Sequence, residues 1–339
     1  MILEFEKPIR DLEARITELH RLAGSNEELQ GEIARLEEAL DAAKKRIYSH
    51  LTPYQRVQVA RHPDRPSFRD YCDALTEDFY ELSGDRLGAD DPAVRGGLAR
   101  VGPYAVVLLG HDKGDEDNSR VANNFGMAHP EGYRRAGRLY SLAGRFGMPI
   151  VTLIDTPGAF AGRKAEERGQ AWAISADLMA LACVPVPVVA VVVGEGGSGG
   201  ALAMCMADHV AMLENSYHSV IAPEACASII FRDPKRAAEA AEALKLTAGD
   251  LKAHGFIDEI LPEPLGGAHK EPEATVKAVA CSVEGALRKL MKCEPEALVK
   301  SRYERYRRMG AHLAEGEVAG ENDAWPDVPV ESPLRSVGE

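Results

Sequence analysis

The chain has 339 residues, of which 45% are hydrophobic and 27% are charged, and its formal net charge is −13 at pH 7. This length and apolar content suffice for one large core with an appendage, or for two modest domains. The acidic balance argues against nucleic acid or an anionic membrane as the main partner, because both attract lysine and arginine.

The sequence contains no pattern that predicts export or membrane insertion. Its longest apolar run, Val184 to Val193, contains two prolines and is well short of the roughly 20 residues that cross a bilayer. The first residues, MILEFEKPIRDLEARI, lack the basic and apolar regions of a signal peptide. The six cysteines are scattered and form no C-x-x-C pair, so reduced thiols are expected, with a nucleophilic cysteine as the alternative. We therefore expect a cytoplasmic protein.

Residues 8 to about 48 are predicted to be helical, because apolar residues recur at spacings of three and four. These residues are Leu12, Ile16, Leu19 and Leu22, then Leu29, Ile33, Leu36, Leu40 and Ile47. The segment AGSN separates the two stripes, and Ser25 with Glu28 matches the capping box of a second helix. The pattern indicates a helical hairpin over residues 1–50, which is either an exposed arm or a subunit contact.

Residues 51 to 262 show an α/β pattern. Three apolar runs rich in β-branched residues have the length of buried strands, namely Tyr104 to Leu109, Pro149 to Ile154 and Val186 to Val193. Longer amphipathic segments, Glu131 to Phe146 and Glu166 to Ala182, alternate with them. This alternation favours parallel strands with helical crossovers.

A helical stretch follows PEPLGGAH and extends to about Met309. The main domain is therefore predicted to cover residues 51–310. Residues 311–339 are acidic and rich in proline and glycine, so we predict that this tail is disordered.

The first of two informative turns is IDTPGAF, in which Asp155, Thr156, Pro157 and Gly158 directly follow a strand. Asp-x-Pro-Gly after a strand also occurs in the switch region of GTPases, but those proteins need an earlier G-x-x-x-x-G-K-[ST] loop, which this sequence lacks. The turn is then either a ligand-binding backbone at the carboxyl end of a strand or a loop held by an Asx cap on Asp155.

The second turn is GEGGSGG. Gly194, Gly196 and Gly199 have the G-x-G-x-x-G spacing of a dinucleotide site, with Glu214 at a distance that suits a ribose contact. That interpretation is weakened because the glycines follow two earlier strand-and-turn units and precede only about two turns of helix, residues 200–207. The alternatives are a purely structural turn and an oxyanion hole.

Gly199 and Gly200 carry the physical case for an oxyanion hole. They lie where the turn is expected to become the helix Ala201 to Met206. Amides in the first helical turn have no acceptor within the helix, and the helix dipole adds positive charge there. Without side chains, a substrate oxygen can approach this backbone closely.

Several longer motifs together resemble one family. They are RHPDRP, GDR, NFGMAHPEGYRRA, IDTPGAF, AEERGQ, VVGEGGSGGALAM, SVIAPEACASI and GFIDEILPEPLGGAH. In this order they are similar to the carboxyltransferase alpha subunit of bacterial acetyl-CoA carboxylase, from the N-terminal helices to about Met309. The resemblance implies a crotonase (ClpP/crotonase-like) α/β fold of repeated ββα units.

The resemblance also implies an activity and its partners. A carboxyl group passes from carboxybiotin, carried on a separate biotin carboxyl carrier protein, to acetyl-CoA, and the product is malonyl-CoA, in the first committed step of fatty acid biosynthesis. In such enzymes the active site lies between alpha and beta subunits of an α2β2 assembly, and a biotin carboxylase supplies the carboxybiotin. The zinc ribbon belongs to the beta subunit, so no metal is expected on this chain.

By this resemblance, Gly199 and Gly200 supply oxyanion-hole amides for biotin, and Gly196 and Gly197 shape the turn. The other expected substrate-binding residues are Asp155, Thr156, Pro157, Gly158, Glu195 and Glu224. Glu195 is either an acid or base, or a hydrogen-bonded loop carboxylate. No side-chain base is evident, which agrees with proton removal by the ureido group of biotin.

Other charged residues are weaker candidates. Glu166, Glu167 and Arg168 form either an ion-pair cluster near IDTPG or an ordinary solvated helix start. His218 and His269 stand alone in apolar or loop contexts and are expected to be structural.

The loop at 115–124 departs from the family, which usually has several basic residues between GHDKG and NFGM. Here the segment is DEDNSRVAN, with Arg120 as its only cation. Two alternatives therefore remain open: a crotonase-fold subunit that carboxylates or decarboxylates another acyl-CoA, and a non-catalytic scaffold subunit.

Overall fold

The computed structural model describes residues 3–23 and 26–310. Its strands form an eight-stranded sheet in the order β1-β2-β3-β4-β5-β6-β8, and β7 pairs with β5. The strands are β1 (Phe79–Glu81), β2 (Val94–Val101), β3 (Tyr104–His111), β4 (Ile150–Thr156), β5 (Val188–Gly197), β6 (His209–Leu213), β7 (Tyr217–Ser219) and β8 (Glu259–Leu261). The expected tail at 311–339 lies outside the described residues.

The sheet is parallel from β3 to β8, as the alternation of strands and helices predicts, but it begins with antiparallel strands. β1 pairs with β2, and β2 pairs with β3, in antiparallel register. The apolar pattern does not predict β2, because Arg95, Gly96 and Gly97 interrupt it. The order β2–β3–α6 then follows the expected ββα unit.

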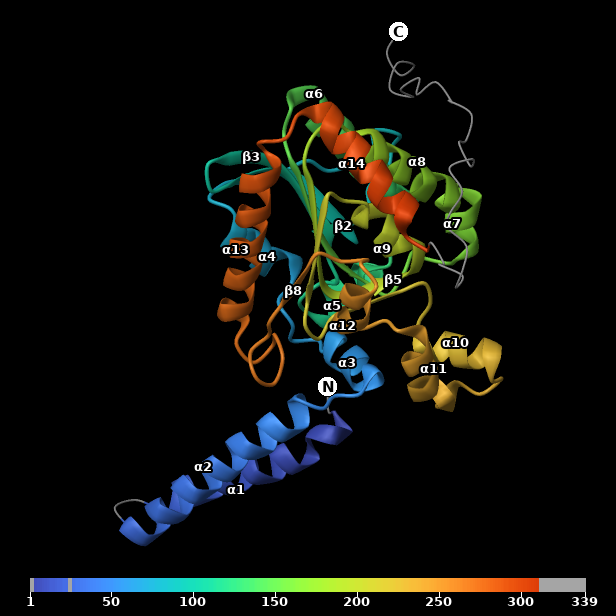
Figure 1. The fold of residues 1–339 in the computed structure, drawn as a ribbon. Helices are drawn as coiled ribbons and strands as arrows, with labels where there is room; N and C mark the ends of the chain where they lie inside the picture. The colour runs from blue at the N-terminus through green and yellow to red at the C-terminus, as the bar shows by residue number, and fades with distance from the viewer. Residues whose placement is uncertain (1–2, 24–25, 311–339) are drawn as a thin grey trace, which may run out of the picture.

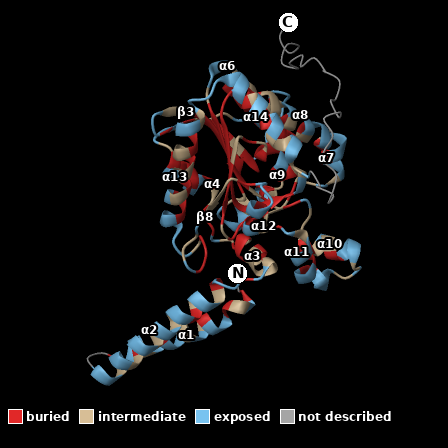
Figure 2. Ribbon diagram, in the orientation of Figure 1, coloured by how far each residue is buried: buried red, intermediate tan, exposed pale blue. Residues whose placement is uncertain are grey.

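Helices cover both faces of the sheet (Figure 1). On one face lie α6 (Pro130–Phe146), α8 (Gln170–Cys183), α9 (Ser198–Cys205) and α14 (Pro295–Arg308), and on the other α4 (Phe68–Leu75) and α13 (Pro272–Leu290). Successive residues of one strand point to opposite faces of the sheet. Val107 and Val192 therefore belong to one buried cluster, and Val106 and Val193 belong to the other. The sheet is therefore buried on both sides, as Figure 2 shows.

The remaining helices are short apart from an N-terminal pair. They are η1 (Glu4–Glu6), α1 (Lys7–Ala23), α2 (Glu27–Tyr48), α3 (Pro53–Ala60), α5 (Asp117–Ala122), η2 (Asn124–Gly126), α7 (Arg163–Glu167), α10 (Pro223–Ile230), η3 (Pro234–Arg236), α11 (Ala237–Leu244) and α12 (Ala248–Ala253). Across residues 3–23 and 26–310, no helix is long and apolar enough to span a bilayer.

The expected helical hairpin is formed by α1 and α2, which extend away from the sheet (Figure 1). Ile16 and Ile33 are buried between the two helices. The predicted cap is displaced by one residue: Asn26, not Ser25, caps α2 and accepts hydrogen bonds from the amides of Glu28 and Leu29. Ser25 itself lies outside the described residues.

Two strand ends position the site. β4 and β5 are parallel neighbours, and Thr156 pairs with Gly196 after a register shift. The predicted turn at Gly194–Gly197 is in fact strand, because β5 continues to Gly197 and gains β7 as a partner there. The change from strand to helix is therefore sharp and occurs between Gly197 and Ser198.

Candidate functional site

The glycine turn consists of Gly197, Ser198, Gly199 and Gly200. Gly197 is the N-cap of α9, and Ser198 begins the helix with a φ of 53°. A non-glycine residue in this left-handed region stores backbone strain, which the surrounding contacts must hold. Gly199 is half-buried and Gly200 is buried. Both amides belong to the first turn of α9, where the helix leaves its N–H groups without acceptors.

Close backbone contacts explain why positions 197 and 200 of the turn are glycine. A Cβ on Gly197 would collide with the carbonyl of Pro157, and a Cβ on Gly200 would collide with the amide of Ala159. A Cβ on Gly199 would meet only the side chain of Ile174, at 3.8 Å. The turn after β4 and the start of α9 are therefore in direct contact, and only Gly199 has room for a side chain.

The turn after β4 is held by Thr156. Its hydroxyl accepts a hydrogen bond from the Gly158 amide at 3.1 Å and donates one to the Gly158 carbonyl at 2.9 Å. The alternative of an Asx cap on Asp155 is therefore wrong. The Asp155 carboxylate instead accepts from the Glu195 amide at 2.8 Å and pairs with Lys113 at 2.6 Å.

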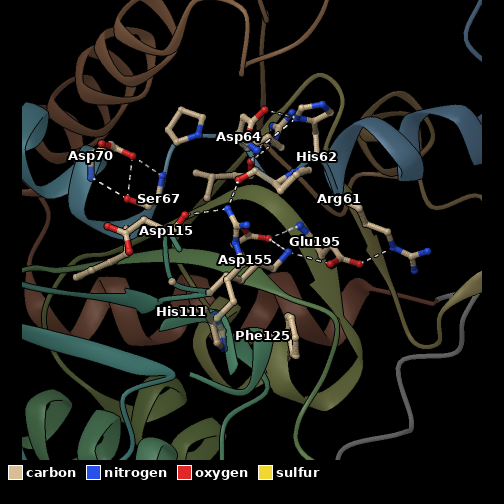
Figure 3. Close-up of a pocket in the computed structure, with 18 of the residues that line it drawn as sticks. Arg61, His62, Asp64, Ser67, Asp70, His111, Asp115, Phe125, Asp155 and Glu195 are labelled. Carbon is tan, nitrogen blue, oxygen red and sulfur yellow. Dashed lines mark hydrogen bonds and ion pairs between the residues drawn. The ribbon is translucent and has the colours of Figure 1, made fainter. Parts of the chain in front are cut away.

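Glu195 is the centre of a buried ion network beside the turn (Figure 3). Its carboxylate accepts hydrogen bonds from Arg61 Nε and Lys113 Nζ, each at 2.8 Å, and from Tyr217 Oη at 2.7 Å. Burial by itself raises the pKa of Glu195, but Lys113 and Arg61 outweigh it and lower the pKa to about 2. Of the two roles considered, this geometry favours the hydrogen-bonded carboxylate over an acid or base.

Glu224 reaches this network only through Arg61. It stands at the start of α10, pairs with Arg61 at 2.6 Å and accepts from Tyr54 Oη at 3.1 Å. It is absent from the lining of the adjacent cleft.

A cleft of about 550 Å³ lies beside the network (Figure 3). Among the predicted site residues, Asp155, Pro157 and Glu195 line it, whereas the glycines of the turn do not. The other lining residues are Arg61, His62, Pro63, Asp64, Arg65, Pro66, Ser67, Phe68, Asp70, Tyr71, His111, Lys113, Gly114, Asp115, Asp117, Arg120, Phe125, Leu153 and Val193. Pro157 thus connects the cleft to the glycine turn.

The acidic loop forms part of this cleft. Asp115 and Asp117 are exposed and line it. Arg120, the cation of the loop, donates to the carbonyls of Pro63 and Asp115 at 3.0 Å each. The loop is thereby attached to the segment before α4.

Sequence reasoning missed four polar residues of the site. Arg61, Lys113 and Tyr217 bind Glu195, and His111 is buried with its ring near the backbones of Leu153 and Gly200. Burial first, and then Lys113, lowers the pKa of His111 to about 3, so the ring is neutral at pH 7. Two indications were available: Arg61 begins the RHPDRP motif, and HDK lies at the end of an apolar strand.

The remaining predicted residues do not gather at the site. The Glu166 side chain is exposed with no partner in the described chain, Glu167 pairs with Arg163 on the surface, and Arg168 pairs with Glu131 at 3.2 Å. The three residues therefore do not form the predicted ion-pair cluster with one another. Glu214 lies near Arg56, at 3.8 Å.

The two histidines pack locally. His218 Nδ1 lies 2.7 Å from the Gly196 carbonyl, and the His269 ring stacks on His62 at 3.8 Å. In the described part of the chain, no three histidine, cysteine or acidic residues are close enough together to hold a metal ion.

Solved structures with a similar fold define the class. The chain is similar to transcarboxylase 12S, with a TM-score of 0.56, 19% identity and coverage of 69% of this chain and 44% of that one. It is equally similar to a Pseudomonas malonate decarboxylase hetero-tetramer in complex with coenzyme A, with a TM-score of 0.56, 17% identity and coverage of 70% and 96%. These likenesses establish the crotonase fold that the sequence resemblance implies.

Sequence comparison defines the family. The family described as acetyl co-enzyme A carboxylase carboxyltransferase-like matches residues 2–310. The acetyl-coenzyme A carboxylase carboxyl transferase subunit alpha of Rubrobacter xylanophilus is 70% identical over 92% of this chain and 97% of its own length. The Thermus thermophilus subunit of the same name is 51% identical over 92% and 99%. The chain belongs to this carboxyltransferase alpha-subunit family.

Proposed function

We propose that this chain is the alpha half of an acetyl-CoA carboxylase carboxyltransferase. It takes part in moving the carboxyl group of carboxybiotin, presented by a carrier protein, to the methyl carbon of acetyl-CoA, which yields malonyl-CoA. One observation carries the chemical part of the proposal. The amides of Gly199 and Gly200 lie in the first turn of α9, which packs closely against the backbone of the turn after β4.

These amides suit a developing negative charge. Charge appears on the ureido oxygen of biotin when the carboxyl group leaves, and two helix N-terminal donors can stabilise it without reorganisation. The Glu195 network supports the turn by linking β3, β4, β5 and α3, since Asp155 binds the Glu195 amide and Lys113 binds both carboxylates. Its carboxylates are already bound by cations, so we assign proton removal to the ureido group.

A beta subunit is the proposed partner, and an apolar surface next to the turn supports this. Trp172 and Met179 of α8 are 80% and 56% exposed, and Leu202 of α9 is 39% exposed. Gln170, in the same first turn of α8 as Trp172, donates to the Phe160 carbonyl at 2.9 Å, so this surface adjoins the turn after β4. Exposed tryptophan and methionine of this kind are typical of protein interfaces.

The remaining assembly follows the family. We propose an α2β2 carboxyltransferase with zinc on the beta subunit, served by a biotin carboxyl carrier protein and a biotin carboxylase. The hairpin of α1 and α2 is proposed as a further subunit contact, because it extends from the body as a separate arm (Figure 1).

The acidic loop favours one second candidate, a subunit that acts on another acyl-CoA. Asp115 and Asp117 line the cleft where the family usually has basic residues, so contacts with CoA phosphates would differ there. Comparison of acetyl-CoA with longer acyl-CoA substrates in the assembled enzyme separates the two candidates.

Reconstitution tests the main proposal. Transfer of label from carboxybiotin to acetyl-CoA is measured with this chain alone, with a cognate beta subunit alone and with both. We expect labelled malonyl-CoA only from the mixture. A mixture that forms a complex and yields no malonyl-CoA would refute the acetyl-CoA assignment.

A further inference from the structure

Two tyrosines lie on one side of α6 with their hydroxyl groups buried. Tyr133 and Tyr140 are seven residues apart, and both are fully buried. Neither hydroxyl has a hydrogen-bond partner in the described part of the chain. Burial, followed by the nearby Asp177, raises the pKa of both, so both hydroxyls are neutral. The two residues therefore share their helix, their burial and their unpaired oxygen.

The two tyrosines differ in the residues that surround the hydroxyl oxygen. Tyr133 Oη lies 2.8 Å from the position that a Cβ on Gly200 would occupy, and the amide of Ala159 approaches the same point. Seven residues of helix place Tyr140 about 10 Å further along α6, and its hydroxyl is not among the nearest atoms to any glycine of the turn. Only Tyr133 thus stands where α6, the turn after β4 and the start of α9 meet.

An unpaired buried hydroxyl needs an explanation, because it takes a polar group out of water without giving it a hydrogen-bond partner. At Tyr133 the oxygen itself occupies the space behind Gly200. Removing it leaves a gap between α6 and the Gly200 backbone, into which the first turn of α9 can move. Small displacements of donors that stabilise a transition state lower the rate strongly.

We propose that Tyr133 is a positioning residue, whose hydroxyl fixes the first turn of α9 against the Ala159 backbone. It thereby keeps the amides of Gly199 and Gly200 directed at the reacting oxygen. This inference rests on the proposed function of those amides. Tyr133 itself touches no reacting atom in this account.

The test compares Tyr133→Phe with Tyr140→Phe in the full chain, assembled with its beta subunit. We expect Tyr133→Phe to lower kcat about tenfold and to leave both KM values within about twofold, because the displaced donors act in the transition state. Tyr140→Phe should leave kcat within about twofold. Both variants should melt within a few degrees of each other, since each loses one buried hydroxyl from the same helix.

A second measurement does not depend on activity. Amide hydrogen exchange over residues 197–203 of the full chain should accelerate in Tyr133→Phe and remain unchanged in Tyr140→Phe. Equal kcat values for the two variants, or unchanged exchange in Tyr133→Phe, would overturn the positioning role. If the wild-type mixture transfers no carboxyl group, the proposed function fails separately, and exchange still decides whether Tyr133 positions the turn.

Discussion

The glycine turn and the ion network beside it are adjacent but use different parts of the chain. The turn presents backbone amides of Gly199 and Gly200, which carry no titratable proton and depend on close packing. The network consists of charged side chains around Glu195, held together by attraction in a buried setting. The comparison teaches that substitutions in the turn should affect catalysis first, whereas substitutions in the network should affect stability and its pH dependence first.

The largest expected effect is a loss of kcat when a substitution disrupts the glycine turn itself. Gly200→Ala places a methyl group against the Ala159 amide and Tyr133 Oη, whereas Gly285→Ala places one where no neighbouring atom lies within 4 Å. Because a lost oxyanion donor costs about 3 kcal/mol, Gly200→Ala should lower kcat about a hundredfold or more. Gly285→Ala lies in α13, on the face of the sheet away from α9, so it serves as the matched control and should retain most activity. Equal losses in steady-state assays of the two variants would contradict this packing account.

The next effect concerns the network. Glu195→Gln removes the charge that binds Arg61 and Lys113, and we expect a loss of about 2 kcal/mol in the free energy of unfolding, measured in urea. Glu166→Gln is the control, because the Glu166 side chain is exposed and has no partner among the described residues. If both variants unfold at the same urea concentration, the network does not stabilise the fold.

The same carboxylate predicts a pH dependence. The pKa of Glu195 is lowered from 4.5 to about 2 in the folded chain. Its contribution to stability is therefore complete above pH 4.5 and is lost as the pH falls towards 2. Wild-type stability should decline more steeply in this window than that of Glu195→Gln. Parallel pH profiles of the two proteins would show that Glu195 is not held ionised.

A smaller effect is expected on binding of the beta subunit at the apolar surface beside the turn. Trp172→Ala should weaken binding of the beta subunit about tenfold, because a largely exposed tryptophan beside the turn would become buried on assembly. Phe146→Ala is the control. Phe146 is 65% exposed but ends α6 just before β4 begins, so it lies at the opposite end of the strands from the turn. Equal affinities for the two variants, measured by calorimetry, would place the interface elsewhere.

The smallest effect concerns the acidic loop. Asp117 is fully exposed, and its Arg120 contact is long, at 3.5 Å. Asp117→Asn should therefore leave kcat and the melting temperature unchanged and alter only the salt dependence of partner and acyl-CoA binding. Asn118→Ala, next to it in the same loop, controls for local changes in conformation. A large fall in kcat for Asp117→Asn alone would move this loop into the reaction site.

The sequence predicts the parts of the fold that depend on local pattern. The apolar runs of β3 and β4 and the amphipathic pattern of α6 are all present with small shifts at their ends. The strand character of Gly194–Gly197 was not predictable, because glycine weakens a strand locally. It is stabilised by distant contacts, since Gly194 leaves room for Asp155 and Gly197 leaves room for Pro157.

The candidate site also has a part that the sequence predicts and a part that it does not. Gly199 and Gly200 are identifiable from their position at a helix start, because the helix alone creates their free amides. The partners of Glu195 are not identifiable, since Arg61 is 134 residues away and Lys113 is 82 residues away in the chain. No periodicity or spacing connects residues at such separations. The parallel order of β3, β4 and β5 brings Lys113 to Glu195, and the packing of α3 against β5 brings Arg61.

The most direct test of the glycine turn is a crystal structure of the assembled carboxyltransferase with biocytin, the biotin-lysine conjugate, bound. The account predicts the ureido oxygen at about 3 Å from the amide nitrogens of Gly199 and Gly200, the usual distance for an oxyanion donor. A ureido oxygen that lies in the cleft beside Lys113 and away from the start of α9 would contradict it.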